Sequence, residues 1–148
     1  MQKPYRACVV AVIIDGHGHV LVGERSDQSG AWQLPQGGID EGEQADQAVL
    51  RELLEEIGTD RVVEVDRLKS LIRYEFPAEM AREQLKKFRG QEQQWYLFRF
   101  QDGVRWDLTR SDGEFSDVKW MRPDQLLEGV IAWKREAYRE GLKGFSLI

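Results

Sequence analysis

The chain has 148 residues and a formal net charge of −5; hydrophobic residues make up 41% and charged residues 32%. These proportions are typical of a globular protein, and we expect one domain that spans residues 1–148. The longest apolar run, residues 8–14, is far shorter than the roughly 18 residues of a membrane span. The acidic excess argues against a protein that tracks a DNA duplex. The single cysteine excludes an internal disulfide, and with no recognisable targeting segment we expect a cytoplasmic protein.

The order of apolar, polar and turn-forming residues predicts strands mixed with helices. In chain order we expect strands at 6–15 and 19–25, a short strand at 31–36, a helix at 44–57, an extended segment at 62–76, a helical or loop segment at 78–89, strands at 93–100 and 117–121, and helices at 123–128 and 131–142. Interspersed strands and helices indicate an α/β (α+β) domain, a mixed β-sheet covered by helices.

The first two predicted strands carry residues that could suggest other chemistry. A turn at residues 15–18 should join these strands as a hairpin. His17 and His19 lie at this turn, and because no third ligand is near in sequence, a polar turn is favoured over a metal site. Cys8 lies in an apolar run and is expected to be a small buried core residue.

The helix predicted at residues 44–57 has two contrasting faces. The apolar stripe that should face the core consists of Leu50, Leu53, Leu54 and Ile57, spaced i, i+3, i+4 and i+7. Roughly opposite, one exposed face carries three carboxylates, those of Glu52, Glu55 and Glu56. Gly58 follows as the expected C-terminal cap.

The three clustered carboxylates suggest a metal site, although a solvated acidic face is the simpler alternative for an arbitrary helix. Two carboxylates about 5 Å apart repel by roughly 3 kcal/mol at an effective dielectric of 20. A pair between Arg51 and Glu55 would return only about 0.2–0.5 kcal/mol. A divalent cation would offset the repulsion, and oxygen-only ligands favour Mg²⁺ or Mn²⁺ over Zn²⁺. Gly37 and Gly38, in the loop before the helix, would let the backbone approach such a ligand closely.

The same region resembles a known family motif. Gly37, five residues, Glu43, seven residues and then Arg-Glu-Leu-Leu-Glu-Glu-Ile-Gly at 51–58 resemble the Nudix box, with Thr59 where the family usually has an aliphatic residue. The resemblance implies a Nudix-type α/β/α sandwich that hydrolyses a nucleoside diphosphate linked to another group. It implies that Glu52, Glu55 and Glu56, helped by the Gly37 carbonyl, hold Mg²⁺, with Mn²⁺ as a substitute. Glu43 and Arg51 would support them, with Arg51 orienting a glutamate.

Four further segments resemble one branch of the family, the bacterial RNA 5′-pyrophosphohydrolases and plant-type dinucleoside polyphosphate hydrolases. They are Pro-Gln-Gly-Gly at 35–38, Gly-Gln-Glu-Gln-Gln-Trp-Tyr at 90–96, Gly-Glu-Phe at 113–115 with Trp120, and Trp-Lys-Arg at 133–135 with Tyr138. Two positions depart from that branch: Gln94 replaces a basic residue, and Gly113 replaces a proline. The loss of the basic residue would weaken a phosphate contact.

The branch resemblance implies a set of substrate contacts. These are Arg25, Gln36, Tyr74, Gln93, Trp133 and Lys134. Trp133 would stack on a base and Arg25 would contact phosphate, while Glu114 would be a further metal ligand or the base that accepts a proton.

Several of these positions also have ordinary structural explanations. A solvated charge is the alternative at Arg25, a solvent-facing acid at Glu114, and a core position at Tyr74. Three other tryptophans, Trp32, Trp95 and Trp120, lie in predicted strands and are better explained as core residues. The basic residues at 78–89 are better explained as a solvated face than as an RNA contact; they are Arg82, Lys86, Lys87 and Arg89.

The leading functional hypothesis is an Mg²⁺-dependent RNA 5′-pyrophosphohydrolase, in which water attacks phosphorus and the 5′-triphosphate end becomes a 5′-monophosphate. The alternatives are an asymmetric diadenosine tetraphosphate hydrolase and a nucleoside triphosphate pyrophosphohydrolase of the nucleotide pool. A non-catalytic nucleotide or RNA sensor is disfavoured, because such a module should lose the glutamates that this chain retains. We expect a nucleoside polyphosphate or an RNA 5′ end as partner; no sequence feature specifies an oligomeric state.

Overall fold

A computed structural model describes residues 3–80 and 82–148, without the side chains of residues 82–84. The strands are β1 (Tyr5–Ile13), β2 (Val20–Arg25), β3 (Trp32–Gln33), β4 (Gln36–Gly38), β5 (Val62–Arg67), β6 (Ile72–Glu75), β7 (Gly90–Phe100) and β8 (Phe115–Met121). The helices are α1 (Ala45–Ile57), α2 (Arg82–Lys87), α3 (Pro123–Gly129) and α4 (Arg135–Gly144), with 3₁₀ turns η1 (Leu108–Arg110) and η2 (Ala132–Lys134). None of the described helices is long and apolar enough to cross a bilayer.

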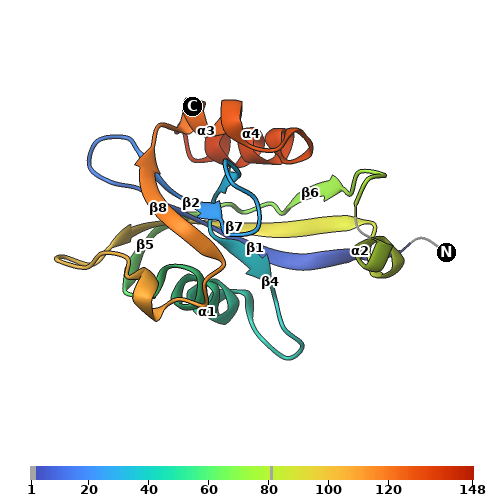
Figure 1. Cartoon of the computed structure of the whole chain (residues 1–148), viewed down its shortest axis with the longest axis horizontal. Coiled ribbons are helices and arrows are strands. Elements are labelled where there is room, and N and C mark those ends of the chain that lie inside the picture. Colours follow the sequence, from blue (N-terminus) through green and yellow to red (C-terminus); the bar gives the residue numbers. More distant parts are fainter. Residues whose placement is uncertain (1–2, 81) are drawn as a thin grey trace.

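The strands form two sheets that lie between helices. The larger sheet has the order β4-β1-β7-β5, with β6 also paired to β7, and the smaller sheet has the order β3-β2-β8. Strands β1 and β7 are parallel, and the other described pairs are antiparallel, so the arrangement is mixed. Helix α1 covers one side of the sheets, and α3 and α4 cover the other (Figure 1). This confirms the predicted α+β class and the α/β/α layering.

Two hydrophobic clusters fill the spaces between the layers. Along β1, Val9, Ala11 and Ile13 belong to the cluster that contains residues of α1. The alternate residues Val10 and Val12 belong to the cluster that contains residues of α3 and α4. Successive side chains of a strand point to opposite faces, and both faces of β1 are covered, which explains why nearly every residue of this segment is apolar.

The predicted hairpin between the first two strands is wrong. Ile14 and Val20 form a single bridge, after which β2 pairs with β3 and β8 in the other sheet. The physical reason is that β4 and β7 already occupy both edges of β1. The turn itself is polar, as expected, because Asp15 Oδ1 accepts the backbone N–H groups of His17 and His19 at 2.8 and 2.9 Å.

Two predicted segments are interrupted. The strand expected at 31–36 divides at Leu34–Pro35, where the chain crosses from the smaller sheet in β3 to the larger sheet in β4. Pro35 has no N–H to donate to a ladder, but its carbonyl accepts the Ala11 N–H at 2.9 Å. The extended segment expected at 62–76 divides into β5 and β6, which both pair with β7 in the larger sheet. Gln33 ends β3 and Gln36 begins β4, so the two glutamines lie on either side of this crossover.

Helix α1 is rotated relative to the predicted stripe. Leu50 and Leu54 are 37% and 42% exposed, whereas Val49 and Leu53 are buried. Glu56, expected on the exposed acidic face, is 0% exposed. The buried positions 49, 53 and 56 follow an i, i+4, i+7 pattern, so the helix packs with one carboxylate turned inward instead of a fourth aliphatic residue.

Candidate active site

The ends of α1 are fixed by local interactions. At its start, the Gln44 N–H donates to the Gln47 side chain at 2.9 Å. At its end, Gly58 adopts a left-handed conformation with φ 77°, and its N–H bonds to the Leu54 carbonyl. A Cβ at Gly58 would overlap the Asp107 carbonyl oxygen, so only glycine fits this cap. These contacts set the register in which the glutamates of α1 meet the rest of the site.

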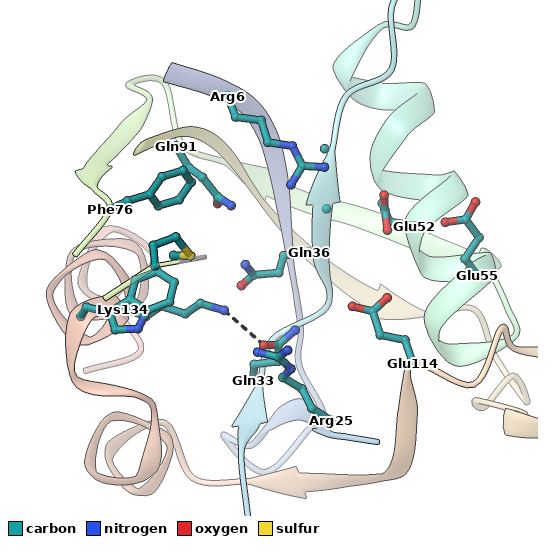
Figure 2. A pocket seen from close by; sticks show the side chains of 14 residues that line it. Arg6, Arg25, Gln33, Gln36, Glu52, Glu55, Phe76, Gln91, Glu114 and Lys134 are labelled. Carbon is teal, nitrogen blue, oxygen red and sulfur yellow. Dashed lines mark hydrogen bonds between the residues drawn. The ribbon is translucent and has the colours of Figure 1, made fainter. Parts of the chain in front are cut away.

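A cleft of about 490 Å³ lies where the two sheets, α1 and the segment before α4 meet. Its acidic side carries Glu52, Glu55 and Glu114; its basic residues are Arg6, Arg25 and Lys134; Phe76, Met80 and Trp133 give it an apolar end. Figure 2 shows the carboxylates on one side, Lys134 and Phe76 on the other, and Gln36 between them. The cleft therefore offers opposite charges and an aromatic surface to one ligand.

Arg51 connects the glycine-rich loop to the acidic helix face. Its guanidinium donates to Glu43 at 2.8 Å, to the Gly38 carbonyl at 2.8 Å, to Glu52 at 3.0 Å and to Glu55 at 3.2 Å. The hydrogen bonds from Arg51, helped by the Asp40 N–H, lower the pKa of Glu43 to about 2. Arg51 thus holds the loop against the helix and orients two of the three carboxylates, and the pair with Glu55 expected from the sequence is present.

Glu56 lies beneath the cleft in an unusual environment for a carboxylate. Its Oε1 accepts the Gln36 N–H at a long 3.5 Å, and its Oε2 has no hydrogen-bond partner among the described residues. Burial raises the pKa of Glu56 well above its usual value, and the charges of Glu114 and Glu52 raise it further. An uncompensated buried charge is costly, so this group needs a cation or a proton.

The residues at this point fit a divalent cation. The donor set consists of oxygen atoms only, which suits a hard cation such as Mg²⁺. Gly37 brings its backbone against the Glu52 carboxylate, and a Cβ at position 37 would overlap that carboxylate. Burial also raises the pKa of Glu52 and of Glu114. In the part of the chain that the structure describes, no three metal-binding side chains already form a metal site, and Glu52 and Glu55 are hydrogen-bonded to Arg51.

The structure brings four of the six expected substrate contacts to the cleft: Arg25, Gln36, Trp133 and Lys134. Tyr74 lies behind Trp133, with ring centroids 5.6 Å apart, and its hydroxyl is buried without a partner among the described residues.

Gln93 does not reach the cleft. It is 1% exposed, donates to Gln91 at 3.0 Å and accepts the Trp95 indole N–H at 2.9 Å. Gln91, two residues earlier on the same face of β7, lines the cleft in its place.

Two of the expected cationic contacts already have partners within the protein. The Arg25 guanidinium forms two hydrogen bonds with Asp27, at 2.9 and 2.6 Å. The Lys134 ammonium donates to Gln33 Oε1 at 3.2 Å, and burial lowers the pKa of Lys134 to about 8. Arg25 is therefore held by Asp27 at the edge of the cleft, whereas Lys134 is held by Gln33 inside it.

Sequence reasoning missed five residues that line the cleft: Arg6, Gln33, Phe76, Met80 and Gln91. They come from separate elements, and their proximity depends on the pairing of β1 with both β4 and β7. The available signal was Arg6, a charged residue within the largely apolar strand β1.

The other sequence-derived candidates lie outside the cleft. Trp95 is fully buried, Trp120 packs against Phe100 and Trp106, and Trp32 lies under the Lys119 ammonium at 4.2 Å. The core interpretation therefore holds for Trp95 and Trp120.

Among the described side chains of the basic segment, those of Lys86, Lys87 and Arg89, none lines the cleft. Lys86 and Lys87 are exposed on α2, and Arg89 pairs with Glu75. The Arg82 side chain lies outside the described residues.

Comparison with known proteins identifies the family. The NUDIX domain family model matches residues 4–141. The chain belongs to the Nudix family. An RNA pyrophosphohydrolase of Wolbachia sp. subsp. Brugia malayi is 39% identical over 148 aligned residues, which cover 98% of this chain and 92% of the relative. An RNA pyrophosphohydrolase of Helicobacter pylori is 37% identical, with 99% and 96% covered. The family resemblance read from the box is thereby confirmed.

Solved structures of low sequence identity share the fold. An Escherichia coli dihydroneopterin triphosphate pyrophosphohydrolase superposes with a TM-score of 0.72 at 22% identity, with 93% of this chain and 97% of that chain covered. A Caenorhabditis elegans Ap4A hydrolase gives a TM-score of 0.64 at 16% identity, with 96% and 98% covered. These two proteins support the Nudix architecture of the chain.

Proposed function

We propose that this protein is an RNA 5′-pyrophosphohydrolase that removes pyrophosphate from 5′-triphosphorylated RNA and leaves a 5′-monophosphate. The observation that carries the proposal is the near full-length similarity to RNA pyrophosphohydrolases. The box glutamates are all retained in the sequence, with Glu52 and Glu55 lining the cleft and Glu56 buried beneath it. The protein is an enzyme of the pyrophosphohydrolase class. Its unpaired cysteine and an RNA substrate are both consistent with the cytoplasm, where we place it.

Different residues of the cleft bind the base and the phosphate chain of the substrate. Trp133 stacks on a base near the 5′ end, a contact worth about 1–3 kcal/mol. Lys134 and Arg25 bind oxygens of the phosphate chain, and the chain extends from them toward the carboxylates. The fixed distance between the aromatic end and the acidic side selects which phosphorus atom reaches the carboxylates.

The acidic side performs the hydrolysis. Nudix hydrolases generally use divalent metal ions, and we propose Mg²⁺, held by Glu52, Glu55 and Glu56 with the Gly37 carbonyl. When bound, the cation offsets phosphate charge and activates water. A carboxylate of this side, that of one of the three box glutamates or of Glu114, accepts the proton from the attacking water, which contributes about 10²–10⁴ in rate. Water adds to phosphorus, the bridging P–O bond breaks, and pyrophosphate leaves.

Parallel assays of two substrates test the proposal. Purified protein with Mg²⁺ is incubated with 5′-triphosphorylated RNA in one tube and with diadenosine tetraphosphate in another, and Glu56→Gln is the matched inactive control. We expect conversion of the RNA to its 5′-monophosphate with release of pyrophosphate. Rapid cleavage of the dinucleotide with inert RNA would overturn the proposal and assign the alternative, a dinucleoside polyphosphate hydrolase.

A further inference from the structure

A chain of hydrogen bonds runs from helix α4 to the acidic side of the cleft. The Tyr138 hydroxyl accepts the Leu34 N–H at 3.0 Å and contacts Gln36 Oε1 at 2.8 Å. The Gln36 backbone N–H in turn donates to Glu56 at 3.5 Å. Tyr138 is 1% exposed and lies outside the set of residues that line the cleft, so it can affect a ligand only through another residue.

The direction of each hydrogen bond fixes the orientation of the Gln36 amide. A backbone N–H can only donate, so the Tyr138 oxygen accepts from Leu34, and its own proton is left for Gln36. That proton requires an acceptor, so the oxygen of the Gln36 amide faces Tyr138. The NH₂ group therefore faces the other way, into the cleft, where Figure 2 places Gln36 between Lys134 and the carboxylates. An amide without this constraint could rotate and present its oxygen, which would repel a phosphate.

A second contact of the same helix end supports this arrangement. Lys134 precedes Tyr138 by four residues, one turn away, and donates to Gln33 at 3.2 Å. The two side chains thus bind Gln33 and Gln36 on either side of the Leu34–Pro35 crossover. The end of α4 fixes the crossover with side-chain hydrogen bonds as well as apolar packing.

We propose that Tyr138 is a positioning residue that holds the Gln36 amide so that its NH₂ donates to a phosphate oxygen of the bound polyphosphate. The inference deepens the proposed function, on which it rests for the phosphorylated substrate. It assigns a role in binding to a fully buried side chain that never touches the substrate.

The test is Tyr138→Phe, which removes only the hydroxyl. Loss of one oriented donor to a charged group predicts an increase in KM of about ten-fold with a much smaller change in kcat. Tyr96→Phe is the matched control: it removes a tyrosine hydroxyl that bonds to Asp46 at 2.6 Å, away from the cleft, and should leave KM unchanged. Urea unfolding of both variants reports whether the fold is retained.

A double-mutant cycle separates positioning from general stabilisation. In a Gln36→Met background, Tyr138→Phe should change KM by less than about two-fold, because the residue it positions is gone. Gln36→Glu, which keeps an acceptor for Tyr138 but offers no NH₂, should raise KM at least as much as Tyr138→Phe. The positioning role would be refuted if the effects of the two substitutions on KM were independent and multiplied in the double mutant. It would also be refuted if Tyr138→Phe lost stability while its KM stayed unchanged.

The positioning role of Tyr138 can be tested independently of which nucleotide or RNA is the substrate. Inorganic tripolyphosphate, which has the same anionic chain and no nucleoside, can be titrated calorimetrically against wild type, Tyr138→Phe and Tyr96→Phe. We expect weaker binding only in Tyr138→Phe. If 5′-triphosphorylated RNA is not hydrolysed but Tyr138→Phe still binds tripolyphosphate more weakly than the other two proteins, the proposed function is overturned and the positioning role stands. If all three proteins bind tripolyphosphate equally, the positioning role is overturned.

Discussion

Lys134→Met should make the protein more stable at neutral pH and a poorer binder of polyphosphate. Burial lowers the pKa of Lys134 from the usual 10.5 to about 8, helped by the Arg25 charge, while Glu114, Glu56 and Cys8 act in the opposite direction. At about 1.4 kcal/mol for each pKa unit, holding this cation in the cleft costs the folded state about 3 kcal/mol. Methionine fills a similar volume without a charge, but it leaves Gln33 without its donor, which returns about 1–3 kcal/mol of the gain.

The pH dependence of the unfolding free energy separates the effect of the Lys134 charge from the effect of losing its hydrogen bond to Gln33. Below pH 8 the lysine is charged in both folded and unfolded chains, and its full cost is present. Between pH 8 and 10.5 the folded protein releases its proton first, so the unfolded chain binds more protons and wild-type stability rises with pH. Relative to Lys134→Met, the wild type should therefore gain about 2 kcal/mol between pH 7 and pH 10.

Urea unfolding at pH 7 and pH 10 measures this difference, because the titrating groups that do not interact with Lys134 contribute equally in the two proteins and cancel. Lys119→Met is the matched control, since it removes a lysine that lies over an indole ring on the surface instead of one inside the cleft. In wild type KM should rise as pH increases through 8, and in Lys134→Met it should be high throughout. Stability differences between wild type and Lys134→Met that are equal at both pH values would refute the reasoning.

Three further substitutions test other parts of the cleft. Glu56→Gln should lower kcat by at least about 100-fold without lowering the urea midpoint, because a neutral amide replaces a buried carboxyl; near wild-type turnover would contradict its role. Trp133→Ala should raise KM about ten-fold or more through the loss of base stacking, with kcat little changed, and an unchanged KM would remove the stacking assignment. Asp27→Ala should lower KM by up to about five-fold, because it frees the Arg25 guanidinium from an exposed ion pair worth about 0–1 kcal/mol; a higher KM would show that Asp27 orients Arg25 instead of competing for it.

The sequence predicted the fold class, the family and the ends of α1 because these depend on local patterns. The apolar run of β1, the glycine at position 58 and the box spacing are each contained in a short stretch of chain. Strand pairing was harder to predict, since both faces of β1 and of the first half of β2 are apolar. Hydrophobicity alone then does not specify which strand edges pair. The hairpin prediction failed at this point, and the cleft residues Arg6 and Gln91 were missed because they adjoin through the pairing of β1 with β7.

The burial of Glu56 could not be predicted from the helical periodicity of apolar residues, for a different reason. A stripe drawn from the largest apolar residues placed Leu50 and Leu54 in the core, and the structure exposes both. Helical periodicity assumes that apolar side chains are buried first. At this site the buried position is taken by a carboxylate, and its advantage arises only with a ligand.

Because their charged groups are buried, the acidic side of the cleft needs a positive charge nearby and the lysine side needs a negative charge, and one ligand complex can supply both. Burial favours the protonated form of Glu56 and the neutral form of Lys134, so each side is held in a costly state when charged. The residues that keep the two sides apart are the glutamines of the β3–β4 crossover, which are polar but carry no charge of their own. A polyphosphate with a divalent cation brings positive charge to the carboxylates and negative charge to the lysine at the same time. Ligands that bind only the folded state stabilise it, so under the proposed function the free energy lost in burying these charges would be recovered when cation and polyphosphate bind together.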